Sequence, residues 1–226
     1  NKKHVIIESS NKEDSVILMR HKDRINKVTL MGGKYGVKVK GDAKVFITDV
    51  IIKNNNKDGI IAEEGDVRNE RKVSISKSEI MNNGRTGIFS HKRRLSIMDN
   101  NIHDNKSDGI DIEQNSNAWI EGNDVKDNGA SGIKVRIDGS SIEVKKNNIR
   151  DNNREGVEVE FDGKAGRVNV AKSEFIENRR FGIAKIQDFK INHESGKLWD
   201  KYLTFNNGNS KFVNNFGGKI SEIIVR

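Results

Sequence analysis

The chain of 226 residues contains no cysteine and no proline, and only 6% of its residues are aromatic. Without cysteine no disulfide can support the fold, and a zinc site would lack its usual sulfur ligands. The five histidines are scattered without metal-ligand spacing, and no Ser/His/Asp constellation can be assembled. No apolar run is long enough to span a membrane. These absences argue against thiol, zinc and triad chemistry.

The charged residues are abundant and mixed in sign. Charged and apolar residues each make up 33% of the chain, and mean hydropathy is −0.74. The net charge of +8 permits a polyanionic partner such as an acidic polysaccharide. A nucleic-acid partner is not expected, because aromatics are few and no basic stripe alternates with stacking residues. The one dense basic run, 91–94, is interpreted as a solvated turn between strands.

A short pattern recurs six times along the chain. In each copy an apolar residue is followed three positions later by Asn, four later by Gly, and then at once by Ile or Val. The copies are Ile52–Asn55–Gly59–Ile60, Ile80–Asn83–Gly87–Ile88, Ile102–Asn105–Gly109–Ile110, Val125–Asn128–Gly132–Ile133, Ile149–Asn152–Gly156–Val157 and Phe175–Asn178–Gly182–Ile183. Fixed internal spacing with a period of about two dozen residues is typical of a solenoid.

The apolar residues within each repeat alternate with polar ones, which predicts short strands with one buried face. Three such strands fit into one coil: Leu95 and Ile97, then Ile102, then Ile110 and Ile112. The pattern therefore predicts an all-β, single-stranded parallel β-helix of eight or nine coils. Residues 1–226 form one domain, in which 1–30 are irregular first coils, 31–186 regular repeats, 187–202 an insertion and 203–226 a degenerate last coil. No amphipathic capping helix is evident, so self-association or a longer parent chain is also expected.

The recurring polar residues have structural roles in this scheme. The repeated Asn tolerates left-handed backbone, and its amide can bond both its own turn and the Asn of the next coil. A second polar row is predicted at the sharper corner, formed by Ser78, Asn100, Asn123, Asn147 and Ser173. The recurring Gly is expected to supply either a positive φ or room for close backbone approach.

The string [Asn/Ser]-x-[Ile/Val/Phe]-x-x-Asn-x-x-x-Gly-[Ile/Val] resembles the right-handed parallel β-helix repeats of the pectate-lyase-like superfamily. The resemblance covers about residues 28–186. It implies a right-handed helix, a secreted or cell-surface location, and a carbohydrate ligand on the sheet formed by the strand after Gly. Members of the superfamily include polysaccharide lyases, glycoside hydrolases, uronate epimerases, tailspikes and non-catalytic surface proteins, so the motif indicates the fold more strongly than the activity.

Alternation places charged side chains on the outer face of the strands after Gly. The central candidates for catalysis are Asp111, Glu113, Lys134, Arg136, Glu158 and Glu160. Carboxylates two residues apart on a strand stand ~6.5–7 Å apart, within the ~6.5–9.5 Å used by inverting glycosidases. The four carboxylates Asp111, Glu113, Glu158 and Glu160 could instead hold Ca²⁺. Opposite charges on neighbouring strands could also form only a stabilising ladder.

Two further groups of residues are candidates for binding or catalysis. Asp108 lies in Asn105–Asp111, a segment similar to the Asn-Thr-Asp-Gly-Ile-Asp element of polygalacturonase-type hydrolases, and the resemblance would make it a catalytic carboxylate. The family's other catalytic elements do not appear at matching places. Ile61 and Phe89 are outward apolar residues beside His91. They could stack on a sugar, or be covered by the insertion that contains Trp199 or by a partner chain.

These observations leave three functional hypotheses. The first is a non-enzymatic extracellular or surface module that binds a glycan or scaffolds an assembly. The second is a polysaccharide lyase, hydrolase or epimerase that acts on an acidic polysaccharide around Asp111. The third is a segment of a trimeric fibre or adhesin. No cofactor other than Ca²⁺ is expected.

Overall fold

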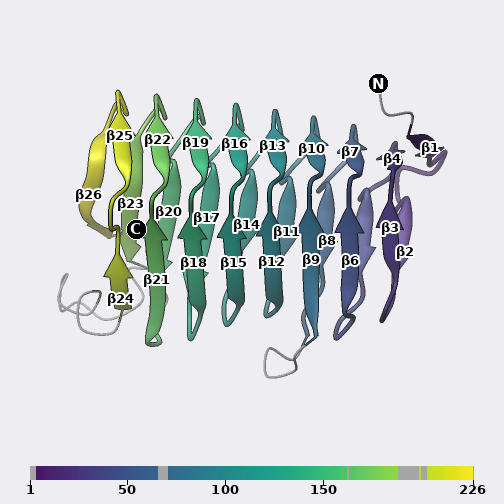
Figure 1. Ribbon diagram of the computed structural model, residues 1–226, viewed down its shortest axis with the longest axis horizontal. Coiled ribbons are helices and arrows are strands. Elements are labelled where there is room, and N and C mark those ends of the chain that lie inside the picture. Colours follow the sequence, from purple (N-terminus) through teal and green to yellow (C-terminus); the bar gives the residue numbers. More distant parts are fainter. Residues whose placement is uncertain (1–3, 66–70, 162, 188–198, 200–202, 226) are drawn as a thin grey trace.

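The structure is a computed structural model that describes residues 4–65, 71–161, 163–187, 199 and 203–225. Its strands form three parallel sheets of nine, nine and eight strands, which run side by side along the long axis of the molecule (Figure 1). Successive strands of the chain join different sheets, and every third strand returns to the same sheet one coil further on. The predicted parallel β-helix with three short strands per coil is confirmed. The described residues include no helix long and apolar enough to cross a membrane.

The first sheet carries the apolar residue that opens each repeat. Its central position is filled by residues such as Ile80, Ile102 and Val125, which are fully buried and lie opposite one another in register. In spatial order its strands are β1 (Val5–Glu8), β4 (Val28–Met31), β7 (Ile51–Lys53), β10 (Glu79–Met81), β13 (Asn101–His103), β16 (Asp124–Lys126), β19 (Asn148–Arg150), β22 (Glu174–Ile176) and β25 (Lys211–Val213).

The second sheet contains the strands that follow the recurring Gly. Ile110, Ile133 and Val157 point into the core from three neighbouring strands. In spatial order the strands are β2 (Ile17–Met19), β5 (Val37–Val39), β8 (Ile60–Ala62), β11 (Ile88–Ser90), β14 (Ile110–Ile112), β17 (Ile133–Ile137), β20 (Val157–Phe161), β23 (Phe181–Gln187) and β26 (Gly218–Val225).

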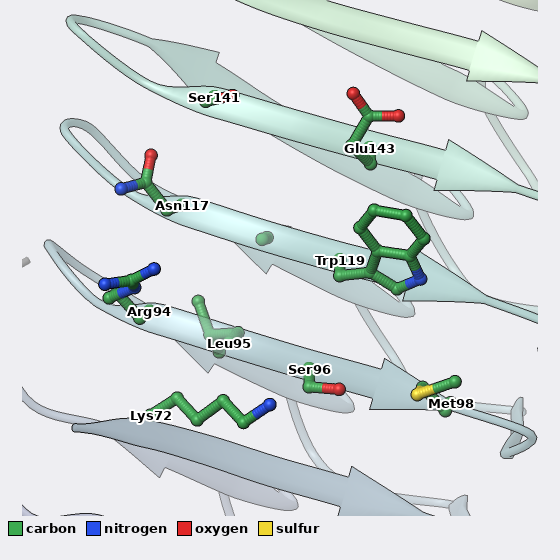
Figure 2. A pocket seen from close by; sticks show the side chains of 10 residues that line it. Lys72, Arg94, Leu95, Ser96, Met98, Asn117, Trp119, Ser141 and Glu143 are labelled. Atoms are coloured by element: carbon green, nitrogen blue, oxygen red, sulfur yellow. The ribbon is translucent and has the colours of Figure 1, made fainter. Parts of the chain in front are cut away.

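The third sheet precedes the sharper corner, and its strands alternate between core and surface. In Figure 2, which shows part of this sheet, Trp119 and Glu143 stand out from its surface. From the C-terminal end, the strands are β24 (Leu203–Asn206), β21 (Gly166–Ala171), β18 (Ser141–Lys145), β15 (Asn117–Glu121), β12 (Arg94–Met98), β9 (Lys72–Ser76), β6 (Val45–Thr48) and β3 (Arg24–Asn26).

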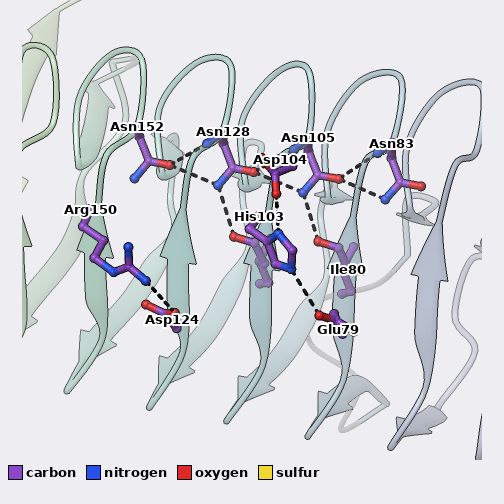
Figure 3. A network of polar contacts seen from close by, with 11 residues as sticks. Glu79, Ile80, Asn83, His103, Asp104, Asn105, Asp124, Asn128, Arg150 and Asn152 are labelled. Carbon is purple, nitrogen blue, oxygen red and sulfur yellow. Dashed lines mark hydrogen bonds and ion pairs between the residues drawn. The ribbon is translucent and has the colours of Figure 1, made fainter.

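A ladder of buried asparagine amides runs along the corner between the first and second sheets (Figure 3). The side chain of Asn105 donates from Nδ2 to Oδ1 of Asn128 at 3.1 Å and to the carbonyl of Ile80 at 3.1 Å. Asn128 repeats this pattern toward Asn152 at 3.0 Å. A second ladder occupies the sharper corner, where Asn100 donates to Asn123 at 2.9 Å. Both predicted polar rows are therefore present, and each links one coil to the next.

The left-handed residues of these corners are not the ladder asparagines themselves. Positive φ falls on the residue before each one, as at Asp104 (φ 54°) before Asn105 and Asp127 (φ 53°) before Asn128. The sharper corner follows the same rule with Asp99 (φ 56°) before Asn100. This placement turns the chain between two strands while leaving the amide free to face the next coil, which explains the difference from the predicted role.

The recurring glycines serve close packing and not a positive φ. A Cβ built on Gly109 would stand 2.7 Å from the carbonyl oxygen of Gly132 and 2.8 Å from Nδ2 of Asn128. Gly132 meets the same kinds of atoms in its own next coil. Of the two predicted reasons for glycine, the structure supports room for backbone approach.

Replacing Asn128 with Ala tests the ladder. The change removes a buried side chain that donates to Asn152 and Ile102 and accepts from Asn105. Since unpaired buried polar groups each cost about 1–3 kcal/mol, we expect the free energy of unfolding to fall by about 2–4 kcal/mol in urea titrations. The control Asn153→Ala alters an exposed residue and should change the free energy of unfolding by less than about 0.5 kcal/mol. Equal effects of the two substitutions would contradict a stabilising ladder.

Candidate functional site

Six charged residues predicted from alternation lie together on the outer face of the second sheet. We call Asp111, Glu113, Lys134, Arg136, Glu158 and Glu160 the charge ladder. Asp111, Lys134 and Glu158 lie opposite one another on β14, β17 and β20, and Arg136 lies opposite Glu160. Their common location follows from the repeat, because residues about two dozen positions apart in sequence become neighbours on adjacent strands.

Most members of the charge ladder are bound to one another. The guanidinium of Arg136 lies 2.8 Å from a carboxylate oxygen of Glu113 and 3.2 Å from one of Glu160. Lys134 Nζ lies 3.6 Å from Glu160, and Arg154 reaches Glu158 at 3.0 Å. The basic strand in the middle therefore neutralises carboxylates on both sides.

Asp111 has a different environment from the other carboxylates. Its side chain is buried, and its Oδ1 finds no hydrogen-bond partner among the described residues. Burial, with the nearby charges of Glu113 and Asp108, raises its pKa to about 7. Burial alone would lower the pKa of Lys134, but Asp111, Glu160, Glu158 and Asp108 together raise it. Lys134 therefore stays protonated, whereas Asp111 titrates near neutrality.

A buried polar row directly before the recurring glycines was not predicted as a group. It comprises Asp58, Thr86, Asp108, Ser131 and Glu155. Asp108 accepts a hydrogen bond from the backbone N–H of Ser131 at 2.8 Å, and the Ser131 hydroxyl donates to Glu158 at 3.1 Å. Burial raises the pKa of Asp108. The carboxylate suggested by the resemblance to hydrolases thus bonds the backbone of the next coil.

The four carboxylates predicted as calcium ligands form two pairs, with Lys134 and Arg136 on the strand between them. Across the described ranges, no group of three or more His, Asp or Glu side chains is placed to hold a metal ion. The nearest partners of Glu113 and Glu160 are instead the guanidinium nitrogens of Arg136.

The predicted apolar pair adjoins the charge ladder. Phe89 lies between Ile61 and Asp111 in register, and both apolar side chains are half-buried. The guanidinium carbon of Arg85 stands 5.0 Å from the ring centroid of Phe89. The imidazole of His91 lies 3.9 Å from Glu64. Arg85, which lies in the same coil as Phe89, thus partly covers its ring.

Trp199 and part of the basic run lie differently from what the sequence suggested. Trp199 does not cover the apolar pair, because it is buried against Phe205 (ring centroids 5.6 Å apart) and lies 5.5 Å from Lys185 Nζ. The rest of the predicted insertion, apart from Gln187 at the end of β23, lies outside the described residues. The basic run is not wholly solvated either, since Arg93 is buried and its guanidinium donates to the carbonyls of Lys40 and Ala43.

A groove of about 700 Å³ lies on a different face, across the outer surface of the third sheet (Figure 2). We call it the Trp119 groove, since the exposed indole of Trp119 stands within it. The small side chain of Ser96 lies opposite Trp119 on β12, and Glu143 lies opposite it on β18. The lining residues are Lys72, Arg94, Leu95, Ser96, Met98, Asn117, Ala118, Trp119, Ser141 and Glu143.

The indole of Trp119 is held in place although 42% of the residue is exposed. Its Nε1 donates to Glu121 at 2.7 Å, and Lys145 Nζ lies 4.9 Å from the ring centroid. Lys145 also binds Glu143 at 2.6 Å. The groove therefore presents an ordered aromatic surface with hydrogen-bonding groups at its sides.

The Trp119 groove was not predicted from the sequence, although one signal pointed to it. Alternation placed Ala118 and Ile120 in the core, so Trp119 between them had to face outward. An outward tryptophan is informative in a chain that contains only two. The other groove residues are ordinary polar residues and the apolar Leu95, Met98 and Ala118, spread over several coils, and only the stacking of the coils brings them together.

Comparison with known proteins agrees with this architecture. A family model described as "Right handed beta helix region" matches residues 35–218, and the chain belongs to this family. Among solved structures, the chain is similar to the one titled "Crystal structure of pectate lyase Pel9A", with a TM-score of 0.55 and 12% identity over 96% of this chain and 70% of that one. At this identity the likeness concerns the fold alone. No curated protein sequence matches the chain.

Asp111→Asn should change how stability depends on pH. The pKa of Asp111 rises from 3.8 to about 7 on folding, so the folded state holds a proton that the unfolded chain releases. Stability should therefore fall as pH rises from about 4 to about 7. An amide cannot ionise, and the variant should exceed the wild type by about 2–4 kcal/mol above pH 7 while matching it near pH 4. Urea titrations across this pH range would measure the free energy of unfolding of wild type and variant. The same pH dependence in the two proteins would contradict the assigned environment of Asp111.

Proposed function

We propose that the protein is a non-enzymatic extracellular β-helix module that binds a polysaccharide strand in the Trp119 groove. The observation that carries the proposal is the exposed indole, fixed by Glu121 and Lys145 and flanked by an amide and hydroxyl groups. A sugar ring has an apolar C–H face that packs on an aromatic ring and hydroxyl edges that need hydrogen-bond partners. Asn117, Ser96 and Ser141 offer such partners beside the indole.

The form of the groove suits a polymer. It crosses neighbouring parallel strands, which are spaced ~4.8 Å apart, so equivalent positions recur at short and regular intervals. A polysaccharide strand can lie over several coils and leave at both ends. The similarity in fold to a protein named a pectate lyase is compatible with a polysaccharide ligand and does not identify one.

The chemistry of the groove favours binding over bond cleavage. Glu143 is the one carboxylate among the lining residues that the structure describes, and it is engaged by Lys145 at 2.6 Å and by the Asn169 amide at 2.8 Å. Glycoside hydrolysis generally uses two carboxylates on opposite sides of the scissile bond. A single, neutralised carboxylate is better suited to holding a ligand or orienting the indole.

A binding screen with Trp119→Ala tests this function. Wild-type protein is measured by isothermal titration calorimetry against neutral and acidic polysaccharides, and we expect at least one to bind. Trp119→Ala should weaken that binding by about tenfold or more, because an aromatic stacking contact is worth about 0.5–1.5 kcal/mol beyond the apolar area that it buries. The matched control is Phe216→Ala, which removes an aromatic side chain that is 82% exposed outside the groove. No binding by the wild type, or equal loss in both variants, would contradict the proposal.

One observation favours a second candidate function, namely acid–base catalysis on a polysaccharide at the charge ladder. Asp111 titrates near neutrality, and its Oδ1 has no partner within the described part of the chain. A group with such a pKa could donate or accept a proton at neutral pH.

Catalysis is tested on a panel of acidic polysaccharides with and without Ca²⁺. Ultraviolet absorbance detects unsaturated uronates, and a parallel assay detects new reducing ends. Activity lost in Asp111→Asn and kept in Trp119→Ala would make the charge ladder the active site. Activity unaffected by Asp111→Asn would exclude this role for Asp111.

A further inference from the structure

One edge of the Trp119 groove is formed by residues that share the first outward position of successive strands. Lys72 lies opposite Arg94, Arg94 opposite Asn117, Asn117 opposite Ser141, and Ser141 opposite Arg167. Figure 2 shows Lys72, Arg94, Asn117 and Ser141 along the same side of the sheet. The edge is therefore a row of cations and neutral hydrogen-bonding groups without a carboxylate.

Lys72 and Arg94 are a like-charged pair on adjacent strands. Like charges directly opposite each other destabilise a sheet. Within the described ranges, neither side chain forms an ion pair with a carboxylate, and the one acidic residue of the groove is already bound by Lys145. The charge ladder on the second sheet shows the opposite arrangement, in which Arg136 lies between two carboxylates. Among the residues that the structure describes, this pair is thus left without an acidic partner, and an anion between the two cations would neutralise it.

The position of this pair relative to the indole defines the kind of ligand that fits. Arg94 lies two residues before Ser96 on β12, and Ser96 lies opposite Trp119. Spacings of ~3.3 Å per residue and ~4.8 Å between strands put the Arg94 and Trp119 backbones roughly 8 Å apart. A sugar ring over the indole can therefore extend an acidic substituent, or the acidic group of the next sugar, toward the two cations.

We propose that Lys72 and Arg94 form an anion subsite, through which the Trp119 groove selects polysaccharides that carry acidic groups. This inference rests on the proposed polysaccharide binding and adds the class of ligand. The shared ligand chemistry is an oxyanion on a sugar, either a uronate carboxylate or a sulfate ester. Arg94 can donate two parallel hydrogen bonds to such a group, and Lys72 adds a point charge.

A nucleic acid is the less favoured polyanion for this surface. Lys72 and Arg94 do place two basic side chains beside an aromatic residue. The sequence does not reveal this arrangement, because the two cations are about two dozen residues apart. However, among the described residues only one exposed aromatic side chain lines the groove, and Glu143 lies on the strand next to it. Single-stranded nucleic acids usually require several stacking residues and a continuous positive track.

The test compares acidic polysaccharides with neutral forms that have the same sugar backbone, and adds one nucleic acid. Calorimetry at low and at physiological salt measures polygalacturonate against its fully methyl-esterified form, dextran sulfate against dextran, and a single-stranded oligothymidylate. We expect the wild type to bind at least one acidic polymer about tenfold or more tightly than its neutral counterpart, with weaker binding at higher salt. Lys72→Gln/Arg94→Gln should abolish that preference. The control Lys53→Gln/Lys126→Gln removes two lysines from the outer face of the first sheet and should retain it.

The outcomes separate the anion subsite from polysaccharide binding itself. Equal binding of acidic and neutral polymers that is lost in Trp119→Ala would keep the proposed function and overturn the anion subsite. The anion subsite would also be overturned if Lys72→Gln/Arg94→Gln still preferred acidic over neutral polymers. The same holds if the preference disappeared equally in the lysine control. Tighter binding of oligothymidylate than of any polysaccharide would assign the surface to nucleic acid. Absence of polysaccharide binding by the wild type would reject the proposed function.

Discussion

The hydrogen bond from one asparagine amide to the next, repeated from coil to coil, is the constraint on which the rest of this structure depends. From Asn83 to Asn178, each ladder amide at the corner between the first and second sheets donates both to the following asparagine and to a backbone carbonyl of the preceding coil. The amide therefore fixes the position of the corner and the register of the strands on both sides. Because strand register decides which side chains face outward, the surface of the protein follows from these buried contacts.

The outer faces of the second and third sheets have the same in-register strand pairing, but the charges that it places opposite one another differ. On the second sheet, acidic, basic and acidic residues follow one another, and Arg136 binds carboxylates of both neighbours. On the third sheet, Lys72 and Arg94 stand opposite each other beside an ordered indole. A neutralised patch stabilises the fold and offers little to a ligand, whereas two cations that have no carboxylate partner among the described residues leave charge available for binding. This contrast favours the Trp119 groove for ligand recognition and leaves Asp111 as the separate candidate for proton transfer.

Several features of the site could be read from sequence and others could not. Alternation placed the charge ladder on one face, because the strand period of two residues is local and regular. The buried state of Asp108 and Arg93 could not be read in the same way. Asp108 bonds the backbone of the next coil, and Arg93 donates to the carbonyls of Lys40 and Ala43, which lie 53 and 50 residues earlier in the chain. Such contacts depend on how loops of different coils meet, which no local pattern encodes.

The sequence by itself determined the coil: the spacing of Asn, Gly and the apolar residues specifies three short strands, two polar corners and the outward or inward direction of the side chains within the strands. Local sterics and burial suffice for this, since each coil has the same pattern of residues. Only the tertiary structure decided which outward residues of different coils form a groove, which cations lack an acidic neighbour among the described residues, and which carboxylate is buried enough to hold its proton. Those properties depend on distances between residues that are far apart along the chain, and they arise only when the coils are stacked.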